Sequence, residues 1–172
     1  MRLLGAVLAG GQSRRFGGDK ALALLDGRPL IAHVIARLRP QVDALVVVGR
    51  EYGGEKSIAD KPEPGLGPLG GLNAALAYAA ANGFEAVLTC GCDLPRLPLN
   101  LATRLGTGPA FATGQPLLAI WPAVLAPALA VHLARGVDRS LRGWIAATTA
   151  RAVDLGPIAN INVVSDLATL GE

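Results

Sequence analysis

Three short apolar runs divide the first half of the chain, at residues 3–9, 44–48 and 86–90. Continuous apolar runs of this length are typical of strands in a parallel sheet that is covered on both faces. Each run ends at glycine or acidic residues, which indicates that the strand meets a loop. The three runs therefore predict the central strands of a sheet.

Between the first two runs, apolar residues recur at helical spacing instead. Leu30, Val34 and Leu38 show this spacing, with Pro29 at the start of the segment and Pro40 at its end. We expect further helices at 72–81, within 94–105, at 123–133, at 140–148 and at 165–170 with Ser165 as N-cap, and a fourth strand at 117–121. The alternation predicts an α/β protein: a single three-layer α/β/α domain over residues 1–172 with a mostly parallel sheet.

Composition and charge narrow the class of protein. Hydrophobic residues make up 51% of the 172 residues and charged residues 17%, which excludes a disordered chain. The net charge of +3 comes without a long basic run, so the surface suits a small anionic ligand better than nucleic acid.

Residues 106–134 carry no charge, but four prolines interrupt them, so we expect a strand and a helix there rather than a membrane span. Cys90 and Cys92 are too close for an easy disulfide, and we expect reduced thiols in a cytoplasmic protein.

The segment after the first strand combines glycine with positive charge. It reads Leu8-Ala9-Gly10-Gly11-Gln12-Ser13-Arg14-Arg15-Phe16-Gly17-Gly18-Asp19-Lys20. Adjacent glycines allow backbone N–H groups to approach a phosphate closely, and Arg15 and Lys20 add positive charge on the same loop. The spacing matches neither a dinucleotide-binding fingerprint nor a Walker motif. It predicts a loop that binds a triphosphate in another way.

Two further segments lie beyond the carboxyl ends of predicted strands, where ligands bind in such sheets. Asp93 follows the third apolar run, where a carboxylate can hold a hard cation such as Mg²⁺ together with substrate phosphates. Taken alone, Asp93 is equally compatible with capping of the following turn. Residues 60–71 are too long and too rich in glycine for a plain connector, and we expect a binding loop that leads into a helix.

Together these motifs resemble those of the molybdenum cofactor guanylyltransferases, within the nucleotidyltransferase family that has a glycosyltransferase-A-like, Rossmann-like sheet. The resemblance lies in residues 8–20, in Gly-Pro-Leu-Gly-Gly at 67–71, in Cys-Asp-Leu-Pro at 92–95, and in Asn-Ile-Asn at 160–162 followed by Asp-Leu at 166–167. It covers nearly the whole chain, and the first motif is highly specific. It implies transfer of GMP from GTP to the phosphate of molybdopterin, with release of pyrophosphate.

The resemblance also implies roles for individual residues. The residues expected to bind the nucleotide are Leu8, Ala9, Gly10, Gly11, Ser13, Lys20, Asp60 and Asp93, with Asp60 near the guanosine. The expected catalytic residues are Arg15, Lys20 and Asp93, because the reaction needs positioning and charge neutralisation rather than a protein nucleophile. Asp93 is the expected Mg²⁺ ligand. The residues expected on the acceptor side are Gly67, Gly71, Asn160 and Asn162, although both asparagines are also typical of a turn before the final helix.

The choice of GTP rests on Gly-Gly at 10–11 and Asp-Lys at 19–20. Relatives that use CTP typically read Leu-Ala-Ala-Gly and carry Asn or Pro before the lysine. A cytidylyltransferase or sugar-phosphate nucleotidyltransferase of the same fold, and a non-catalytic nucleotide-binding protein, stay open as alternatives.

The chain departs from the family pattern at Gly49, where Asn is frequent, and at 163–164, where Val-Val replaces the usual Thr-Pro. The first departure removes a side-chain hydrogen bond to the nucleotide.

The resemblance also implies the binding partners. They are GTP, molybdopterin or the molybdenum cofactor, other cofactor-biosynthesis proteins and molybdoenzymes, with neither nucleic acid nor a membrane among them.

Overall fold

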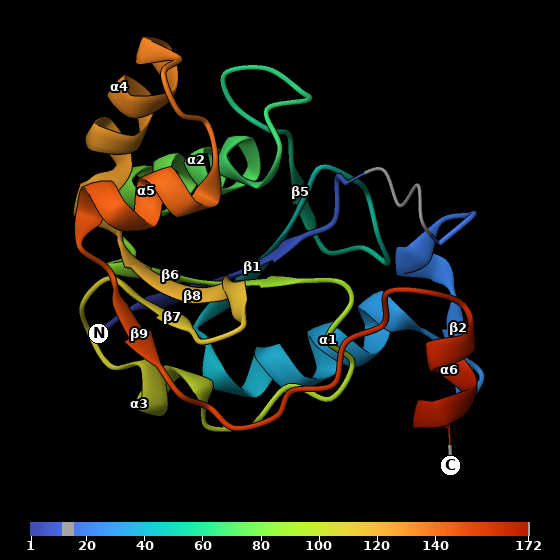
Figure 1. Ribbon diagram of the computed structural model, residues 1–172. Coiled ribbons are helices and arrows are strands. Elements are labelled where there is room, and N and C mark those ends of the chain that lie inside the picture. The colour runs from blue at the N-terminus through green and yellow to red at the C-terminus, as the bar shows by residue number, and fades with distance from the viewer. Residues whose placement is uncertain (12–15, 172) are drawn as a thin grey trace.

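A seven-stranded sheet forms the centre of the protein in the computed structural model, which describes residues 1–11 and 16–171. The strand order is β5-β4-β1-β6-β8-β7-β9. These strands span Leu3–Leu8 (β1), Ala44–Val48 (β4), Lys56–Ile58 (β5), Ala86–Gly91 (β6), Ala110–Ala112 (β7), Gln115–Pro122 (β8) and Arg151–Val153 (β9). β1 pairs in parallel with both β4 and β6, while β8 runs antiparallel to β6 and β7 (Figure 1). The predicted α/β class with a mostly parallel sheet is confirmed.

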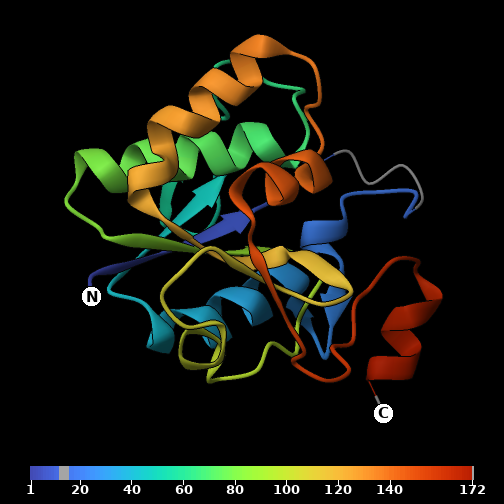
Figure 2. The same cartoon turned by 60° about the vertical axis from the view of Figure 1, so that its left-hand side comes forward.

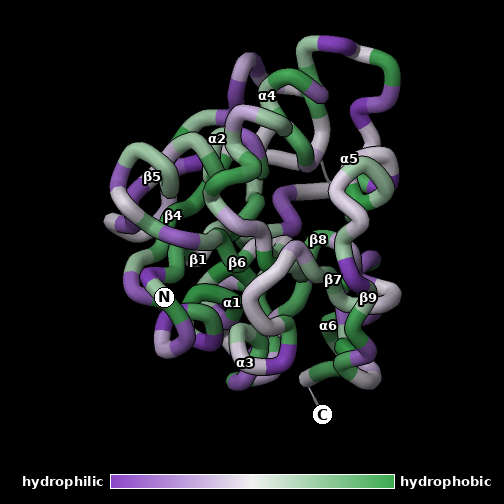
Figure 3. Tube along the Cα trace, turned by 90° about the vertical axis from the view of Figure 1, so that its left-hand side faces the viewer, coloured by the Kyte–Doolittle hydropathy of each residue, from purple (hydrophilic) through white to green (hydrophobic). Residues whose placement is uncertain are grey.

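Helices cover both faces of this sheet (Figures 1 and 2). They span Leu30–Leu38 (α1), Pro68–Ala81 (α2), Leu101–Leu105 (α3), Ala126–Arg135 (α4), Leu141–Thr148 (α5) and Ser165–Leu170 (α6). Val7 of β1 is buried in the core with α1 and α3, whereas Leu4 and Ala6 are buried in the core with α2 and α4. Because both faces of β1 are covered, its sequence is a continuous apolar run, which Figure 3 shows along the central strands.

The predicted start of α2 was four residues too late, because Gly70 and Gly71 were assigned to the preceding loop. The helix begins at Pro68, and both glycines are buried in its first turn. A Cβ atom at Gly71 would lie 3.2 Å from Leu8, and one at Gly70 would lie 3.3 Å from Leu66. Gly71 therefore allows the helix to begin close to β1, and Gly70 allows the preceding loop to pack against its first turn, neither of which sequence periodicity reports.

The start of α6 also differs from the prediction. Ser165 lies inside the helix and Val164 occupies the N-cap position, where no side chain caps the helix. The carboxylate of Asp166 instead accepts hydrogen bonds from the N–H groups of Asn162 and Val163, at 2.7 and 3.0 Å. The acidic residue in the first turn thus orders the chain that leads into the helix.

Several elements were not predicted because they are too short to carry a periodic signal. They are β5, β7, β9 and a small hairpin formed by β2 (Leu24–Leu25) and β3 (Arg28–Pro29). The predicted helix at 123–133 divides into a 3₁₀ turn at Ala123–Leu125 followed by α4. The uncharged segment 106–134 therefore folds as strands and a helix. No helix in the described part of the chain is long and apolar enough to cross a membrane.

The loops that follow β1 and β4 touch through their backbones at Gly10 and Gly49. The N–H of Ala9 donates to the carbonyl of Val48 at 3.0 Å, and the N–H of Gly49 donates to the carbonyl of Ile58 at 2.9 Å. A Cβ atom at Gly49 would lie 2.5 Å from the Cα of Gly10, and Gly49 has a φ angle of +85°. The asparagine that is frequent here in the family has no room in this backbone arrangement.

Gly49→Ala tests this backbone contact against Gly54→Ala, its matched control. Gly54 has a φ angle of +76°, but a Cβ atom there would meet nothing within 4 Å. The unfolding free energy of the control should fall only by the cost of a left-handed non-glycine residue, about 1–2 kcal/mol. The unfolding free energy of Gly49→Ala should fall further, because its Cβ also collides with the backbone of Gly10. Urea denaturation measures both, and equal losses of unfolding free energy would contradict the contact.

Candidate nucleotide-binding site

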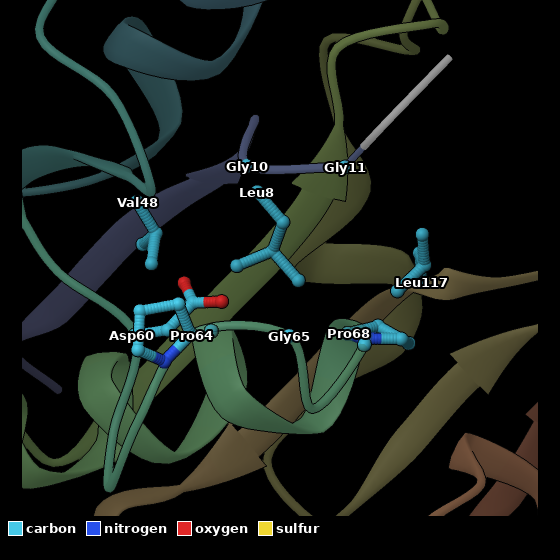
Figure 4. A pocket seen from close by; sticks show the side chains of 11 residues that line it. Leu8, Gly10, Gly11, Val48, Asp60, Pro64, Gly65, Pro68 and Leu117 are labelled. Carbon is cyan, nitrogen blue, oxygen red and sulfur yellow. The ribbon is translucent and has the colours of Figure 1, made fainter. Parts of the chain in front are cut away.

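A pocket of about 680 Å³ opens at the carboxyl ends of β1 and β4, a size typical of small-molecule sites. Leu8 and Val48 line it from the strand ends, Gly10 and Gly11 from the glycine loop, and Leu117 from β8 (Figure 4). The lining is completed by four residues of the loop before α2 and two of its first turn: Asp60, Pro64, Gly65, Gly67, Pro68 and Gly71. The chain passes from β1 to β4 on one side and returns to β6 on the other, so the pocket lies at a topological switch point.

The carboxylate of Asp60 faces this pocket from among four glycines (Figure 4). A Cβ atom at Gly10, Gly49, Gly70 or Gly71 would lie 3.5 to 3.8 Å from one of its oxygens. Side chains at these positions would crowd the carboxylate, whereas glycines leave it accessible to a ligand. Partial burial raises the pKa of Asp60 above its ordinary value, because a charged carboxylate loses hydration there.

Lys20 and Asp93 meet at a second part of the site. Lys20 Nζ lies 3.4 Å from Asp93 Oδ2, and 14% and 26% of the two side chains are exposed. Lys20 opens the 3₁₀ turn Lys20–Leu22, whereas Asp93 follows β6, the neighbour of β1 in the sheet. The structure thus brings together two residues that lie far apart in the sequence and that were both assigned to the site.

Gly91, the last residue of β6, makes room for the Asp93 carboxylate. A Cβ atom at Gly91 would lie 2.6 Å from Asp93 Oδ1 and 3.8 Å from Leu117, which lines the pocket. The carboxylate therefore occupies a space that a side chain at position 91 would fill. The described residues contain no group of three or more His, Cys, Asp or Glu that could hold a metal ion. A single accessible carboxylate fits Mg²⁺, which takes its other oxygens from water and substrate phosphates.

Burial disfavours the thiolate form of the neighbouring cysteines in the free protein. Cys90 and Cys92 are both free, as expected. Burial, with a contribution from the charge of Asp93, raises the pKa of Cys92 to about 11. Burial likewise raises the pKa of Cys90. Both side chains stay protonated thiols, and a thiolate is the form that binds soft metals.

The C-terminal segment reaches the site through Ile161. Its N–H donates to the carbonyl of Asp93 at 2.9 Å, and its side chain is fully buried. The flanking asparagines point to the same side, since Asn162 Nδ2 donates to Asn160 Oδ1 at 3.1 Å. Their shared orientation agrees with the expectation for two residues in an extended segment. Their predicted contact with the acceptor stays a prediction.

The remaining predicted residues fall into two groups. Gly67 and Gly71 line the same pocket as Gly10 and Asp60, although the sequence resemblance assigned the first two to the acceptor and the others to the nucleotide. Gln12, Ser13, Arg14 and Arg15 lie outside the described residues, so the roles predicted for Ser13 and Arg15 stay predictions.

Sequence reasoning missed an ion pair beside the site. Arg50 directly follows Gly49 and binds Asp19, the residue before Lys20. Asp19 was noted in the motif and in the choice of GTP but was given no partner, and Arg50 was not singled out. Its position just beyond the end of β4 was the available signal, because charged residues at strand ends of a parallel sheet gather at one edge.

Comparison with known proteins identifies the family. The MobA-like NTP transferase domain matches residues 5–153 of the chain. The chain belongs to this family. It is similar to the molybdenum cofactor guanylyltransferase of Rhodobacter capsulatus, with 39% identity over 98% of the chain and 94% of that protein. It is also similar to the molybdenum cofactor guanylyltransferase of Cereibacter sphaeroides, with 40% identity over 98% of the chain and 95% of that protein.

A solved structure shows the same fold. The crystal structure of molybdopterin-guanine dinucleotide biosynthesis protein A from Archaeoglobus fulgidus matches with a TM-score of 0.76 and 23% identity, over 96% of this chain and 95% of that one. The family match ends at residue 153, where β9 ends, so Asn160 and Asn162 follow it. The similarity to the two guanylyltransferases covers 98% of the chain and therefore includes this C-terminal segment.

Asp60→Asn should stabilise the ligand-free protein at pH 7. A carboxyl whose pKa is raised by folding favours the protonated form, so its ionisation costs stability as pH rises above the ordinary value of 3.8. The amide stays neutral, so its advantage should shrink as pH falls towards 4. Melting temperatures between pH 4 and 7 measure this dependence.

Asp138→Asn is the control of opposite sign. Hydrogen bonds from Ser140 lower the pKa of Asp138, so its ionised form contributes stability that is present at neutral pH and lost in acid. This variant should therefore melt below the wild type at pH 7. If Asp60→Asn also melts below the wild type at pH 7, the ionised carboxylate contributes to folding and is not a strained group kept for a ligand.

Proposed function

We propose that this chain transfers GMP from GTP to the terminal phosphate of molybdopterin and releases pyrophosphate, with Mg²⁺ as its metal. The single observation that carries the proposal is the pocket in which the glycine loop, Asp60 and the first turn of α2 meet. The names of the relatives with 39% and 40% identity support the acceptor and the nucleotide.

The Asp60 carboxylate suits guanine among the four common bases. It can accept two parallel hydrogen bonds from the N1–H and the 2-amino group of guanine, a pairing that adenine, cytosine and uracil do not offer. Those bonds favour the ionised form, so they would offset the partial burial that raises the pKa of Asp60 in the free protein. Gly67 and Gly71 line the same pocket and leave space for the nucleoside.

The phosphates would lie over the glycine loop, towards Lys20. Gly10 and Gly11 both line the pocket, and adjacent glycines can present N–H groups to phosphate oxygens. Lys20, and Arg15 from the sequence motif, would neutralise charge on the leaving pyrophosphate. In the free protein Lys20 is paired with Asp93, so nucleotide binding would replace this contact with phosphate contacts.

Asp93 would hold Mg²⁺ through a carboxylate oxygen in the space that Gly91 leaves open. The ion, when bound, supplies charge neutralisation on phosphate oxygens. In the reaction an oxygen of the acceptor phosphate forms a bond to the α-phosphorus of GTP, and the bond from that phosphorus to the bridging oxygen of pyrophosphate breaks. The chain positions both phosphates, and no protein nucleophile takes part.

Asn160 and Asn162 would bind the pterin of the acceptor. Amide side chains both donate and accept, which matches the mixed edge of a pterin. Their segment is held next to Asp93 by the Ile161 hydrogen bond, so an acceptor bound there would approach the proposed metal ligand.

We also propose that the protein acts in the cytoplasm, where free thiols such as Cys90 and Cys92 stay reduced.

Pyrophosphate release with molybdopterin and each of GTP, CTP, ATP and UTP tests the function. GTP should be used far faster than the others, and Asp93→Asn should abolish release while the melting temperature changes little. Lys20→Met should lower kcat/KM about 10²–10³-fold, the scale of one charge-stabilising donor. Asp138→Asn, which removes a carboxylate outside the site, should keep wild-type turnover.

Two outcomes would contradict the proposed function. A preference for CTP would indicate the cytidylyltransferase alternative, and nucleotide binding without pyrophosphate release would indicate a non-catalytic protein.

Replacing Asn160 and Asn162 together by Ala tests the acceptor side. GTP should stabilise this variant as it does the wild type, by about 2.7 kcal/mol at 100 times its Kd. The KM for molybdopterin should rise or kcat should fall. Asn82→Ala, which removes an exposed asparagine at the end of α2, is the control and should leave both substrates unaffected. Loss of GTP affinity in a folded variant would refute the division, and unchanged kinetics would favour a purely structural turn.

A further inference from the structure

Arg50 holds the end of the glycine loop through a two-pronged ion pair with Asp19. Its Nη1 donates to Asp19 Oδ1 at 2.8 Å and its Nη2 donates to Asp19 Oδ2 at 2.6 Å. Such a fork fixes the plane of the carboxylate as well as its distance, which a single lysine contact does not. With 24% of the Arg50 side chain exposed, the guanidinium is only partly screened by water.

Arg50 is itself held firmly by its backbone. Its carbonyl accepts a hydrogen bond from the hydroxyl of Ser57 on β5 at 2.7 Å. The preceding Gly49 donates to Ile58 of the same strand, so both residues are tied to the edge of the sheet. The guanidinium therefore extends from a fixed point on the β4–β5 pair towards the glycine loop.

Asp19 connects Arg50 to Lys20, its neighbour in the chain. It stands at the N-cap position of the 3₁₀ turn that Lys20 opens, and its carbonyl accepts from the N–H of Leu22 at 3.1 Å. The two hydrogen bonds from Arg50 orient its carboxylate, which also lies near enough to the N–H groups of Ala21 and Leu22 for them to lower its pKa. On the far side of the turn the Lys20 ammonium reaches Asp93.

We propose that Arg50 is a positioning residue for nucleotidyl transfer: by holding Asp19 it fixes the turn that directs Lys20 to the phosphates. It also neutralises a carboxylate next to Lys20 that would otherwise compete with the phosphates for the ammonium. In keeping with this, the Arg50 guanidinium lowers the pKa of Asp19, so the carboxylate stays ionised at neutral pH. The inference rests on the proposed function, because it assigns Lys20 to the nucleotide phosphates.

Arg50→Met removes both the charge and the fork, and Arg50→Lys removes the fork alone. Arg50→Met should lower kcat/KM for GTP about 10²-fold, the scale for a displaced catalytic group, and Arg50→Lys should recover only part of that loss. The matched control is Arg39→Met, which breaks the ion pair between Arg39 and Glu55 on the same β4–β5 connection. It should leave kcat/KM unchanged.

A double-mutant cycle with Lys20→Met separates positioning from general damage. If Arg50 acts through Lys20, adding Arg50→Met to Lys20→Met should lower kcat/KM by less than about twofold, because the group it positions is already absent. Multiplied losses would overturn the inference, as would wild-type kinetics in Arg50→Met. Should Arg50→Met fail to fold, Asp19→Asn, which weakens the pair from the other side, takes its place in the cycle.

Failure of this inference is distinguishable from failure of the proposed function. Absence of pyrophosphate release by the wild-type protein would contradict the function itself. In that case the same cycle is measured on Mg²⁺–GTP affinity by calorimetry, where an Arg50 effect that persists undiminished without Lys20 overturns the positioning role. An effect that disappears with Lys20 supports it.

Discussion

The backbone contact between Gly10 and Gly49 is the constraint on which the rest of the site depends. β1 and β4 are neighbours in the sheet, so their loops leave it side by side, and the missing Cβ atoms let the two backbones touch. The contact fixes Gly10 at the wall of the pocket, and the absence of Cβ atoms at Gly10 and Gly49 leaves room for the Asp60 carboxylate in the same wall. The tight approach occupies the space in which a longer side chain at position 49 would reach the ligand, so the carboxylate becomes the main polar group of this wall.

Two ion pairs lie side by side along the same edge of the sheet. Arg50 binds Asp19 and Lys20 binds Asp93, so both of these acids have a basic partner in the free protein. Partly exposed pairs of this kind contribute little to stability by themselves. Their value lies in geometry, because they hold long side chains near the positions that a charged ligand will need. A triphosphate and its metal would exchange partners with one of these pairs and leave the other in place.

A small hydrophobic cluster connects the segments that are proposed to bind the nucleotide and the acceptor. Phe16 from the glycine loop, Leu25 and Leu30 from the hairpin and α1, and Ile161 from the C-terminal segment are packed together, apart from the two main cores. The segment that carries the asparagines is thus anchored on the same cluster as the segment that carries the glycines. Since neither segment has a long helix or strand of its own at this point, their packing on this cluster would position the proposed nucleotide and acceptor sides relative to each other.

The sequence by itself determined the class of fold, the central strands and most helices, because buried parallel strands and amphipathic helices leave strong patterns over five or more residues. It also pointed to the glycine loop, Asp60 and Asp93 as residues beyond strand ends. Tertiary structure alone decided the early start of α2, the short strands β5, β7 and β9, and the pairing of Arg50 with Asp19. These features depend on contacts between residues that are distant in the chain. The effect of a missing Cβ atom or of a charge is therefore set by the residue that the fold places beside it, which the sequence alone does not show.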